Sequence, residues 1–334
     1  MVAGARNTPL GVGILDLCGG RAGVRGTGAR PTVRRIVPVS SARVVRLAEA
    51  VPRPRRVAVG TFDGVHLGHR EVIAGADAVL TFEPHPVRVV APSQAPRLIT
   101  TLERKAELIG ELGVAELVVV TFDDEFAARS AESFVDDVLV GALGSTHVSV
   151  GENFRFGHLA SGDAGILQAD GRFEARVVPL LEVDGEVVSS SHIRGLLLGG
   201  AVEYADQLLG APFTLTGEVV HGDERGRELG FPTANLVPRE GYVTPGHGVY
   251  ACRARTQDGQ WHAAAVNVGV RPQFVTGRGE LIEAYLLDFD GDLYGTELRL
   301  EFVKRLRGEK RFESVDVLVE QMGRDVGQTR ALLP

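Results

Sequence analysis

Two histidines three residues apart are the first candidates for chemistry. His66 and His69 lie in residues 60–69, a segment that follows a β-branched run and opens a helical pattern. The start of a helix at the carboxyl end of a parallel strand presents free N–H groups and the positive end of the helix dipole, so phosphates bind there. Gly68 lets a phosphate approach the backbone, and the imidazoles can donate hydrogen bonds to its oxygens as charge builds during transfer. The alternatives are surface histidines or a metal pair, and two histidines without a third ligand make a poor metal site.

A run of serines followed by an arginine is the second candidate. Residues 189–191 are all serine, and Arg194 follows three residues later. Hydroxyl and N–H groups at a helix start bind anionic oxygens, and a guanidinium supplies a permanent planar cation for a triphosphate. The serines are also typical of a simple N-cap before a helix over residues 193–198, and the two roles are compatible.

A glycine-rich segment over residues 222–235 is the third candidate. The chain has no Walker A sequence, so a nucleotide in this half must be bound by another device. Thr233 and Asn235 offer neutral oxygens, which suit a Mg²⁺ ion that keeps several waters and bridges ATP phosphates. The alternative is a long hairpin loop that ends at Pro232. The backbone N–H groups of this segment and its arginine side chains can close over phosphates. The residues concerned are Gly222, Arg225, Gly226 and Arg227.

The first half of the chain is expected to position the histidines and serines on strands and helices that alternate. Residues 55–195 alternate short β-branched runs with stretches of helical spacing, which predicts a parallel sheet covered by helices. Thr100 and Glu103 have the spacing of a capping box, so a helix is expected from there to Gly113. Another helix is expected from Ser130 to Gly144. The expected strands are 56–61, 78–82, 117–122, 147–150 and 176–181.

The pattern changes near residues 200–212, where a short linking helix is expected. Beyond it, apolar runs separated by Asp-Gly turn signals predict an antiparallel barrel. The last 20 residues carry apolar side chains at spacings of three and four, so an amphipathic helix should pack against that barrel. The expected barrel strands are 213–221, 248–255, 261–269, 281–289 and 298–306.

Glu283 lies within one of these expected strands. Side chains alternate along a strand, so Glu283 and Tyr285 share one face while Ile282 and Ala284 share the other. The pattern alone places Glu283 toward solvent. A catalytic role requires it instead at the barrel mouth, where a carboxylate could orient an attacking hydroxyl.

Length and charge bound these interpretations. The 334 residues favour two domains, and 44% hydrophobic with 24% charged side chains is typical of a globular protein. The net charge of −7 gives no general support for binding nucleic acid. Residues 1–35 carry +5 and look like a disordered tail, and no run is long enough to span a membrane. Cys18 and Cys252 stand alone, so we expect neither a disulfide framework nor a structural zinc site, and a cytoplasmic protein.

Several motifs in a fixed order resemble those of one enzyme family. Residues 60–69 resemble the phosphate-binding motif of the nucleotidylyltransferase superfamily. The motifs that follow, together with it, resemble the prokaryotic bifunctional riboflavin kinases/FAD synthetases over about residues 55–334. The matching segments are 81–86, 151–157 and 189–194 in the first half, and 232–235, 248–250, 266–269, 282–285 and 288–295 in the second.

This resemblance implies a fold and two activities. It implies an α/β nucleotidylyltransferase-type, Rossmann-like parallel-sheet domain over residues 36–199, a linker helix over 200–212, and an antiparallel β-barrel riboflavin kinase domain with a C-terminal helix over 213–334. The barrel domain would phosphorylate riboflavin with ATP to FMN, and the first domain would adenylylate FMN with ATP to FAD and pyrophosphate. Riboflavin, FMN and ATP would be the partners and Mg²⁺ the cofactor, with no nucleic acid, membrane or obligate protein partner.

The resemblance also implies roles for individual residues. Glu283 would be the general base of the kinase, and His66 and His69 would hold the ATP phosphates during adenylyl transfer. Other ATP or phosphate contacts would come from Gly60, Phe62, Gly68, Ser190, Ser191, Arg194, Gly222, Arg225, Gly226 and Arg227. Thr233 and Asn235 would hold the metal, and the flavin would contact His85, Asn153, Phe154 and Phe156.

Some roles and activities have alternatives. Phe154 and Phe156 suit either a turn with core aromatics or the lining of an isoalloxazine ring, whereas His85, between two prolines, is better placed for a site than for a core. A short stretch after His69 and a histidine at position 192 depart from the family pattern. A riboflavin kinase with a weak or altered adenylyltransferase half, or a flavin-binding protein without turnover, are the alternative functions.

Overall fold

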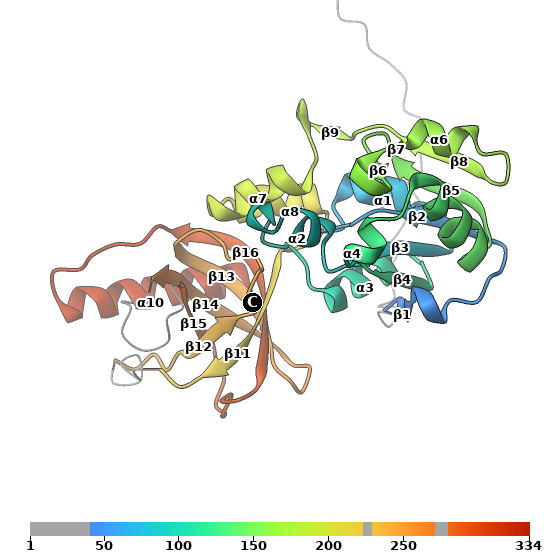
Figure 1. Cartoon of the computed structure of the whole chain (residues 1–334). Helices are drawn as coiled ribbons and strands as arrows, with labels where there is room; N and C mark the ends of the chain where they lie inside the picture. Colours follow the sequence, from blue (N-terminus) through green and yellow to red (C-terminus); the bar gives the residue numbers. More distant parts are fainter. Residues whose placement is uncertain (1–40, 223–228, 271–279) are drawn as a thin grey trace, which may run out of the picture. The chain divides into compact units, whose positions relative to one another are not determined.

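A six-stranded parallel sheet forms the first half of the computed structural model, which describes residues 41–222, 229–270 and 280–334. The strands lie in the order β1-β4-β3-β2-β5-β8, so the chain reverses its direction of winding at β2. Helices lie on both sides of the sheet (Figure 1). The strands are β1 (Arg43–Arg46), β2 (Arg55–Val59), β3 (Ala78–Glu83), β4 (Glu116–Thr121), β5 (Ser145–Gly151) and β8 (Glu174–Val178).

Alternate side chains of the sheet enter two separate cores. Val57 and Val59 belong to the cluster on one face, and Ala58 between them belongs to the cluster on the other. The helices are α1 (Leu67–Ile73), α2 (Pro86–Val90), α3 (Leu102–Glu111), α4 (Asp124–Ala127), α5 (Ala131–Ser133), a π-helix (Phe134–Ala142), α6 (Ala164–Ala169), α7 (Ser190–Leu198) and α8 (Val202–Leu209), with 3₁₀ turns at Leu47–Glu49, Pro92–Gln94 and His158–Ala160. Two small hairpins pair β6 (Arg155–Phe156) with β7 (Gly162–Asp163) and β9 (Glu182–Val183) with β10 (Glu186–Val187).

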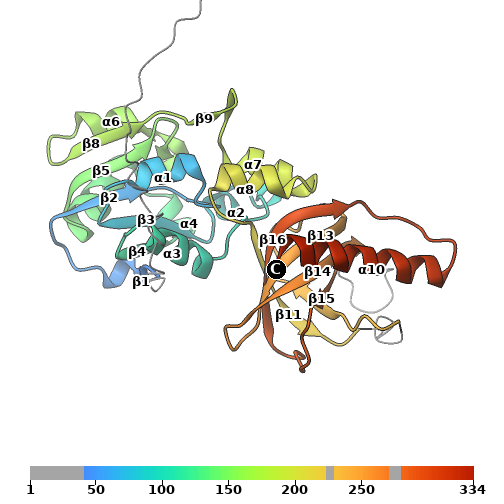
Figure 2. The same ribbon diagram turned by 180° about the vertical axis from the view of Figure 1, so that it is seen from behind.

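The second half is a closed antiparallel barrel of six strands in the order β11-β12-β15-β14-β13-β16. A C-terminal helix, α10 (Val315–Leu332), lies against β13 and β14 (Figure 2). The strands are β11 (Thr214–Val220), β12 (Ala234–Pro238), β13 (Gly248–Arg255), β14 (Trp261–Val270), β15 (Glu280–Leu286) and β16 (Glu297–Arg307).

Both sequence-based fold classes are confirmed, with three corrections. The cap of α3 is Thr101, whose hydroxyl accepts a hydrogen bond from the Arg104 N–H, and not Thr100, which accepts from the Gly64 N–H. Strands β1 and β12 were not expected. The helix after His69 is short, as the sequence indicates, and α8 ends at Gly210 in the left-handed conformation that glycine favours.

Two predictions fall outside the described residues: the disordered tail over 1–35, and the phosphate contacts from Arg225, Gly226 and Arg227. The domain boundaries stay predictions. Among the helices that the structure describes, none has the length and apolar character needed to cross a bilayer.

Candidate functional site

The turn between β2 and α1 has an unusual backbone. Phe62 and Val65 have φ of 49° and 45°, in the left-handed region that side chains disfavour, and both are almost fully buried. Two hydrogen bonds stabilise the turn at the Thr61 carbonyl. This carbonyl accepts from the Thr81 hydroxyl at 3.0 Å and from the Lys105 ammonium at 2.7 Å. Burial and these contacts offset the backbone cost of this turn, which lies at the carboxyl end of the sheet.

The two histidines lie at the start of α1 with their rings stacked. The ring centroids are 3.5 Å apart and the planes differ by 16°. His66 is the N-cap, and its Nδ1 accepts a hydrogen bond from the His69 N–H at 3.2 Å. An accepting Nδ1 places the proton of the neutral ring on Nε2, which makes Nε2 a donor. A Cβ on Gly68 would lie 3.3 Å from the His66 ring, so this glycine makes room for that ring.

Burial keeps both imidazoles neutral near pH 7. It lowers the pKa of His66 to about 4. The pKa of His69 is held well below its usual range by burial, and further by His66 and the Lys105 cation. The pair can therefore donate hydrogen bonds to phosphate oxygens, but it adds no fixed positive charge of its own.

Asp63 connects the histidine turn to the serine-rich helix. Its carboxylate, only 2% exposed, binds the Arg194 guanidinium at 3.1 Å and accepts hydrogen bonds from the N–H groups of Ile99 and Thr100. The Ser190 hydroxyl donates to the Asp63 carbonyl at 2.8 Å. The motifs around positions 66 and 194 are therefore joined, and Asp63 is a site residue that the sequence reasoning did not single out.

The serine-rich segment caps a helix, as expected, while its phosphate-binding role stays a prediction. Ser189 is the N-cap of α7 and accepts from the His192 N–H at 3.2 Å. Ser191 is exposed, at the first turn of the helix. Arg194 also donates from Nε to the Arg97 carbonyl at 2.7 Å, so its guanidinium is fixed before any ligand binds.

The flavin candidates of the first half differ in how accessible they are. Phe156 is 7% exposed and packs in the core, 5.2 Å from the Phe134 ring. Phe154 stacks on Phe156 at 5.5 Å and stays partly exposed, and Asn153 is exposed. His85 caps α2 by accepting from the Val87 N–H, and burial lowers the pKa of its ring. Phe154 rather than Phe156 is thus the ring available to a ligand.

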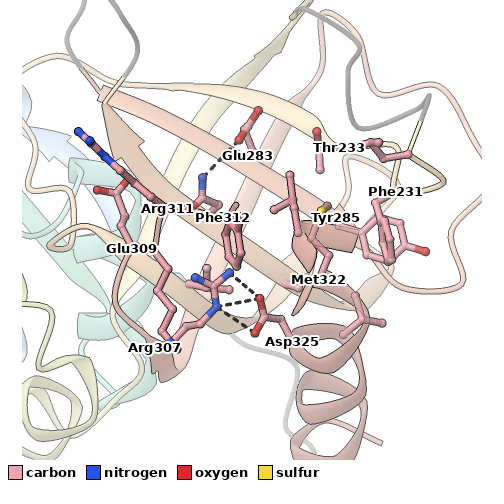
Figure 3. A pocket seen from close by; sticks show the side chains of 17 residues that line it. Phe231, Thr233, Glu283, Tyr285, Arg307, Glu309, Arg311, Phe312, Met322 and Asp325 are labelled. Atoms are coloured by element: carbon pink, nitrogen blue, oxygen red, sulfur yellow. Dashed lines mark hydrogen bonds and ion pairs between the residues drawn. The ribbon is translucent and has the colours of Figure 1, made fainter. Parts of the chain in front are cut away.

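Two pockets adjoin one another on the barrel. The larger, of about 650 Å³, lies between the strands and α10, and Glu283 and Thr233 are part of its wall (Figure 3). The second, of about 430 Å³, is lined by Asn235 and residues 289–294. Thr233 lines both pockets, so groups bound in the two would meet at this residue.

Three polar side chains lie in one row across the barrel strands. In the register of the sheet Glu283 on β15 is opposite Asn235 on β12 and Asn267 on β14. The Asn267 side-chain amide donates to a Glu283 carboxylate oxygen at 3.3 Å. Glu283 is half-buried and lines the larger pocket, so its face of the strand is partly covered. A Cβ on Gly222 would collide with the Asn235 side-chain amide, so this glycine makes room for Asn235 in its present position.

The C-terminal helix forms one wall of the larger pocket. Its apolar stripe, expected to pack against the barrel, lines the pocket through Leu318, Met322 and Val326. A buried ion pair joins the helix to the barrel, in which Arg307 on β16 donates from Nε and Nη2 to Asp325 at 2.7–3.1 Å (Figure 3). Asp325 is 4% exposed, and the Gln321 amide also donates to it.

The donor chemistry of the barrel fits magnesium bound together with phosphates. In the part of the chain that the structure describes, no three His, Cys, Asp or Glu side chains form a metal cluster. The Thr233 hydroxyl and the Asn235 side-chain oxygen are hard, neutral donors, which suit an ion that keeps waters and phosphate oxygens as its other ligands.

Comparisons with known proteins agree with this division of the chain. A family model described as FAD synthetase matches residues 48–192, and one described as riboflavin kinase matches residues 209–333. Two similar proteins are named bifunctional riboflavin kinase/FMN adenylyltransferase. The one from Listeria monocytogenes is 40% identical, and the match covers 82% of this chain and 91% of that protein. The one from Bacillus subtilis is 39% identical, and the match covers 80% of this chain and 89% of that protein. A solved structure titled macrolide-efflux protein, from Streptococcus pneumoniae, is 31% identical with a TM-score of 0.77 and covers 86% of this chain and 98% of its own.

Proposed function

Because the chain belongs to the bifunctional riboflavin kinase/FMN adenylyltransferase family, we propose which of its residues carry each of the two activities. The enzyme phosphorylates riboflavin to FMN and adenylylates FMN to FAD, using ATP in both reactions. The barrel half carries the kinase, and the parallel-sheet half carries the adenylyltransferase.

The kinase substrates occupy the two adjoining pockets of the barrel. Riboflavin binds in the larger pocket, against the apolar stripe of α10, and ATP binds in the smaller one with its γ-phosphate toward Thr233. The 5′-hydroxyl oxygen attacks the γ-phosphorus while its proton passes to Glu283, and the bond to the β,γ-bridging oxygen breaks to release ADP. The observation that carries this assignment is that Thr233 lines both pockets.

Asn267 orients the base for this step, and Thr233 and Asn235 would bind the metal. The Asn267 amide fixes the Glu283 carboxylate by a 3.3 Å hydrogen bond, leaving its other oxygen to accept the hydroxyl proton. The Thr233 hydroxyl and the Asn235 side-chain oxygen would hold Mg²⁺, which would supply charge neutralisation for the phosphates of ATP when bound.

Adenylyl transfer takes place at the turn between β2 and α1. A phosphate oxygen of FMN attacks the α-phosphorus of ATP, the bond to the α,β-bridging oxygen breaks, and pyrophosphate leaves. No proton has to be removed from the attacking phosphate, because it is largely ionised near pH 7. Nε2 of His66, the ring of His69 and the N–H groups of Phe62 and Gly68 donate to the phosphates, and Arg194 with Ser190 and Ser191 completes the site. Phe154 and His85 contact the flavin.

The two assignments are tested by separating the flavins that variants produce from riboflavin, ATP and Mg²⁺. The double substitution His66→Ala with His69→Ala should leave FMN accumulating without FAD. Glu283→Ala or Asn235→Ala should stop FMN formation while added FMN is still converted to FAD. Loss of FMN formation in the histidine variant would show that the chemistries are assigned to the wrong halves. FMN without FAD from the unaltered protein would show a weak adenylyltransferase half.

A further inference from the structure

A lysine is buried directly beneath the turn that carries the two histidines. The chain has 3 lysines against 33 arginines, and only Lys105 of the three is buried, at 6% exposure. It projects from α3, and its ammonium donates to the Thr61 carbonyl at 2.7 Å and to the Thr81 hydroxyl at 3.4 Å. Both acceptors are neutral.

The charge of Lys105 has no carboxylate in direct contact. Within residues 41–222, 229–270 and 280–334, no Asp or Glu forms an ion pair with its ammonium. The charged groups near it are Asp63 in the turn and Glu83 at the end of β3, which act at longer range. Asp63 is already bound to Arg194. Burial lowers the pKa of Lys105, and these two carboxylates oppose that effect.

The field of Lys105 reaches the residues around the proposed phosphate and flavin positions. It lowers the pKa of His69 on α1 and of His85 after β3, in both cases together with burial. A cation buried without a paired anion costs several kcal/mol of solvation. Binding of a polyanion next to a buried cation offsets part of this solvation cost, because Coulomb interactions are strong where water is excluded.

We propose that Lys105 is a positioning residue for adenylyl transfer, which fixes the histidine turn through the Thr61 carbonyl and supplies the buried positive charge that attracts the triphosphate of ATP. Lysine suits this place because a compact ammonium fits beneath a single carbonyl, whereas a planar guanidinium needs more room. The neutral histidine pair then orients the phosphates, and Lys105 with Arg194 supplies the fixed charge. The inference rests on the proposed placement of adenylyl transfer at this turn.

The test replaces Lys105 with an uncharged residue and measures FAD formation and FMN formation by the same variant. In Lys105→Met the KM for ATP in FAD formation should rise about tenfold to a hundredfold, as expected for the loss of one buried charge near the phosphates. The KM for FMN should stay within about twofold. The KM for ATP in FMN formation should not change, because that reaction uses the barrel. Lys304→Met, at an exposed lysine of β16, is the matched control and should alter neither reaction.

Melting temperature and a second variant separate this role from a purely structural one. Removing a buried unpaired charge should leave the melting temperature of Lys105→Met unchanged or raise it. Lys105→Arg should bind ATP more tightly than Lys105→Met. An unchanged KM for ATP, an unfolded Lys105→Met protein, or an equal loss of both reactions would each overturn the proposal. Normal FAD formation by the double histidine variant would instead overturn the placement of the site, whatever Lys105 does.

Discussion

Asp63 and Arg194 form an ion pair of 3.1 Å that joins two motifs 131 residues apart in the sequence. Both side chains are largely buried, at 3% and 14% exposure. Asp63 has no place in the catalytic step, yet it fixes the start of α7 relative to the histidine turn. The proposed phosphate site therefore joins two segments that are distant in the sequence.

Asp63→Asn should weaken FAD formation without unfolding the protein. An amide oxygen can still accept from the Ile99 and Thr100 N–H groups, but the charge that holds Arg194 is lost. We expect kcat/KM for FAD formation to fall about tenfold to a hundredfold, and FMN formation to stay unchanged. Asp77→Asn removes an exposed ion pair with Arg56 and serves as the control. An unaltered kcat/KM in Asp63→Asn would refute the positioning role.

The free energy of unfolding should depend on pH through His66. Burial lowers its pKa to about 4 in the folded protein, from the ordinary histidine value of 6.5. A depressed histidine pKa means that its contribution to stability is complete above about pH 6.5 and is lost as the pH falls toward 4. At pH 5 this group alone should cost roughly 2 kcal/mol relative to pH 7. Urea unfolding of His66→Gln should show a smaller loss between pH 7 and 5, and equal losses in both proteins would contradict the assignment.

Local sequence patterns predict the elements better than they predict the walls of the site. Strands with two buried faces are recognisable from their β-branched runs, so the parallel sheet is predicted to within a few residues. Strand β1 is short and partly exposed at the sheet edge, which leaves no such run. Glu283 follows the alternation of its strand, but alternation cannot show that α10 closes a pocket over that face.

Local patterns also could not identify residues whose importance depends on their neighbours in the fold. Lys105 is one charged side chain in a helix rich in charges, and nothing local marks it as buried. The stripe on α10 has the spacing of a core-facing helix, but it lines a pocket, since periodicity identifies an apolar face and not what covers it. Family motifs predict the phosphate-binding residues, whereas the link through Asp63 becomes visible only when the structure brings Asp63 and Arg194 together.

Asn267→Ala should slow phosphoryl transfer to riboflavin. The variant removes the 3.3 Å hydrogen bond that fixes the Glu283 carboxylate while the carboxylate itself remains. We expect kcat for FMN formation to fall about tenfold with little change in the KM for riboflavin, because orientation of the base matters most in the transition state. Glu283→Gln should abolish the reaction, and FAD formation from added FMN measures the intact half. A raised KM with normal kcat would show that Asn267 contacts substrate instead.

Asp325→Ala should impair riboflavin binding by releasing α10 from the barrel. The variant leaves Arg307 without its anion, and breaking one partner of a buried pair costs about 3–5 kcal/mol. If α10 docks mainly through this pair, the pocket wall formed by Leu318, Met322 and Val326 becomes mobile. The KM for riboflavin should then rise at least tenfold while the KM for ATP in FAD formation stays the same.

A matched variant on the same helix makes the α10 prediction specific. Glu320→Ala removes an exposed pair with Arg324, whose side chains are 69% and 49% exposed, so it should change the free energy of unfolding by less than about 0.5 kcal/mol. Its KM for riboflavin should match that of the unaltered enzyme. Equal effects of the two substitutions would mean that helix stability, and not the docking of α10 by Asp325, controls the pocket. A normal KM in Asp325→Ala would mean that the apolar stripe holds α10 in place without the ion pair.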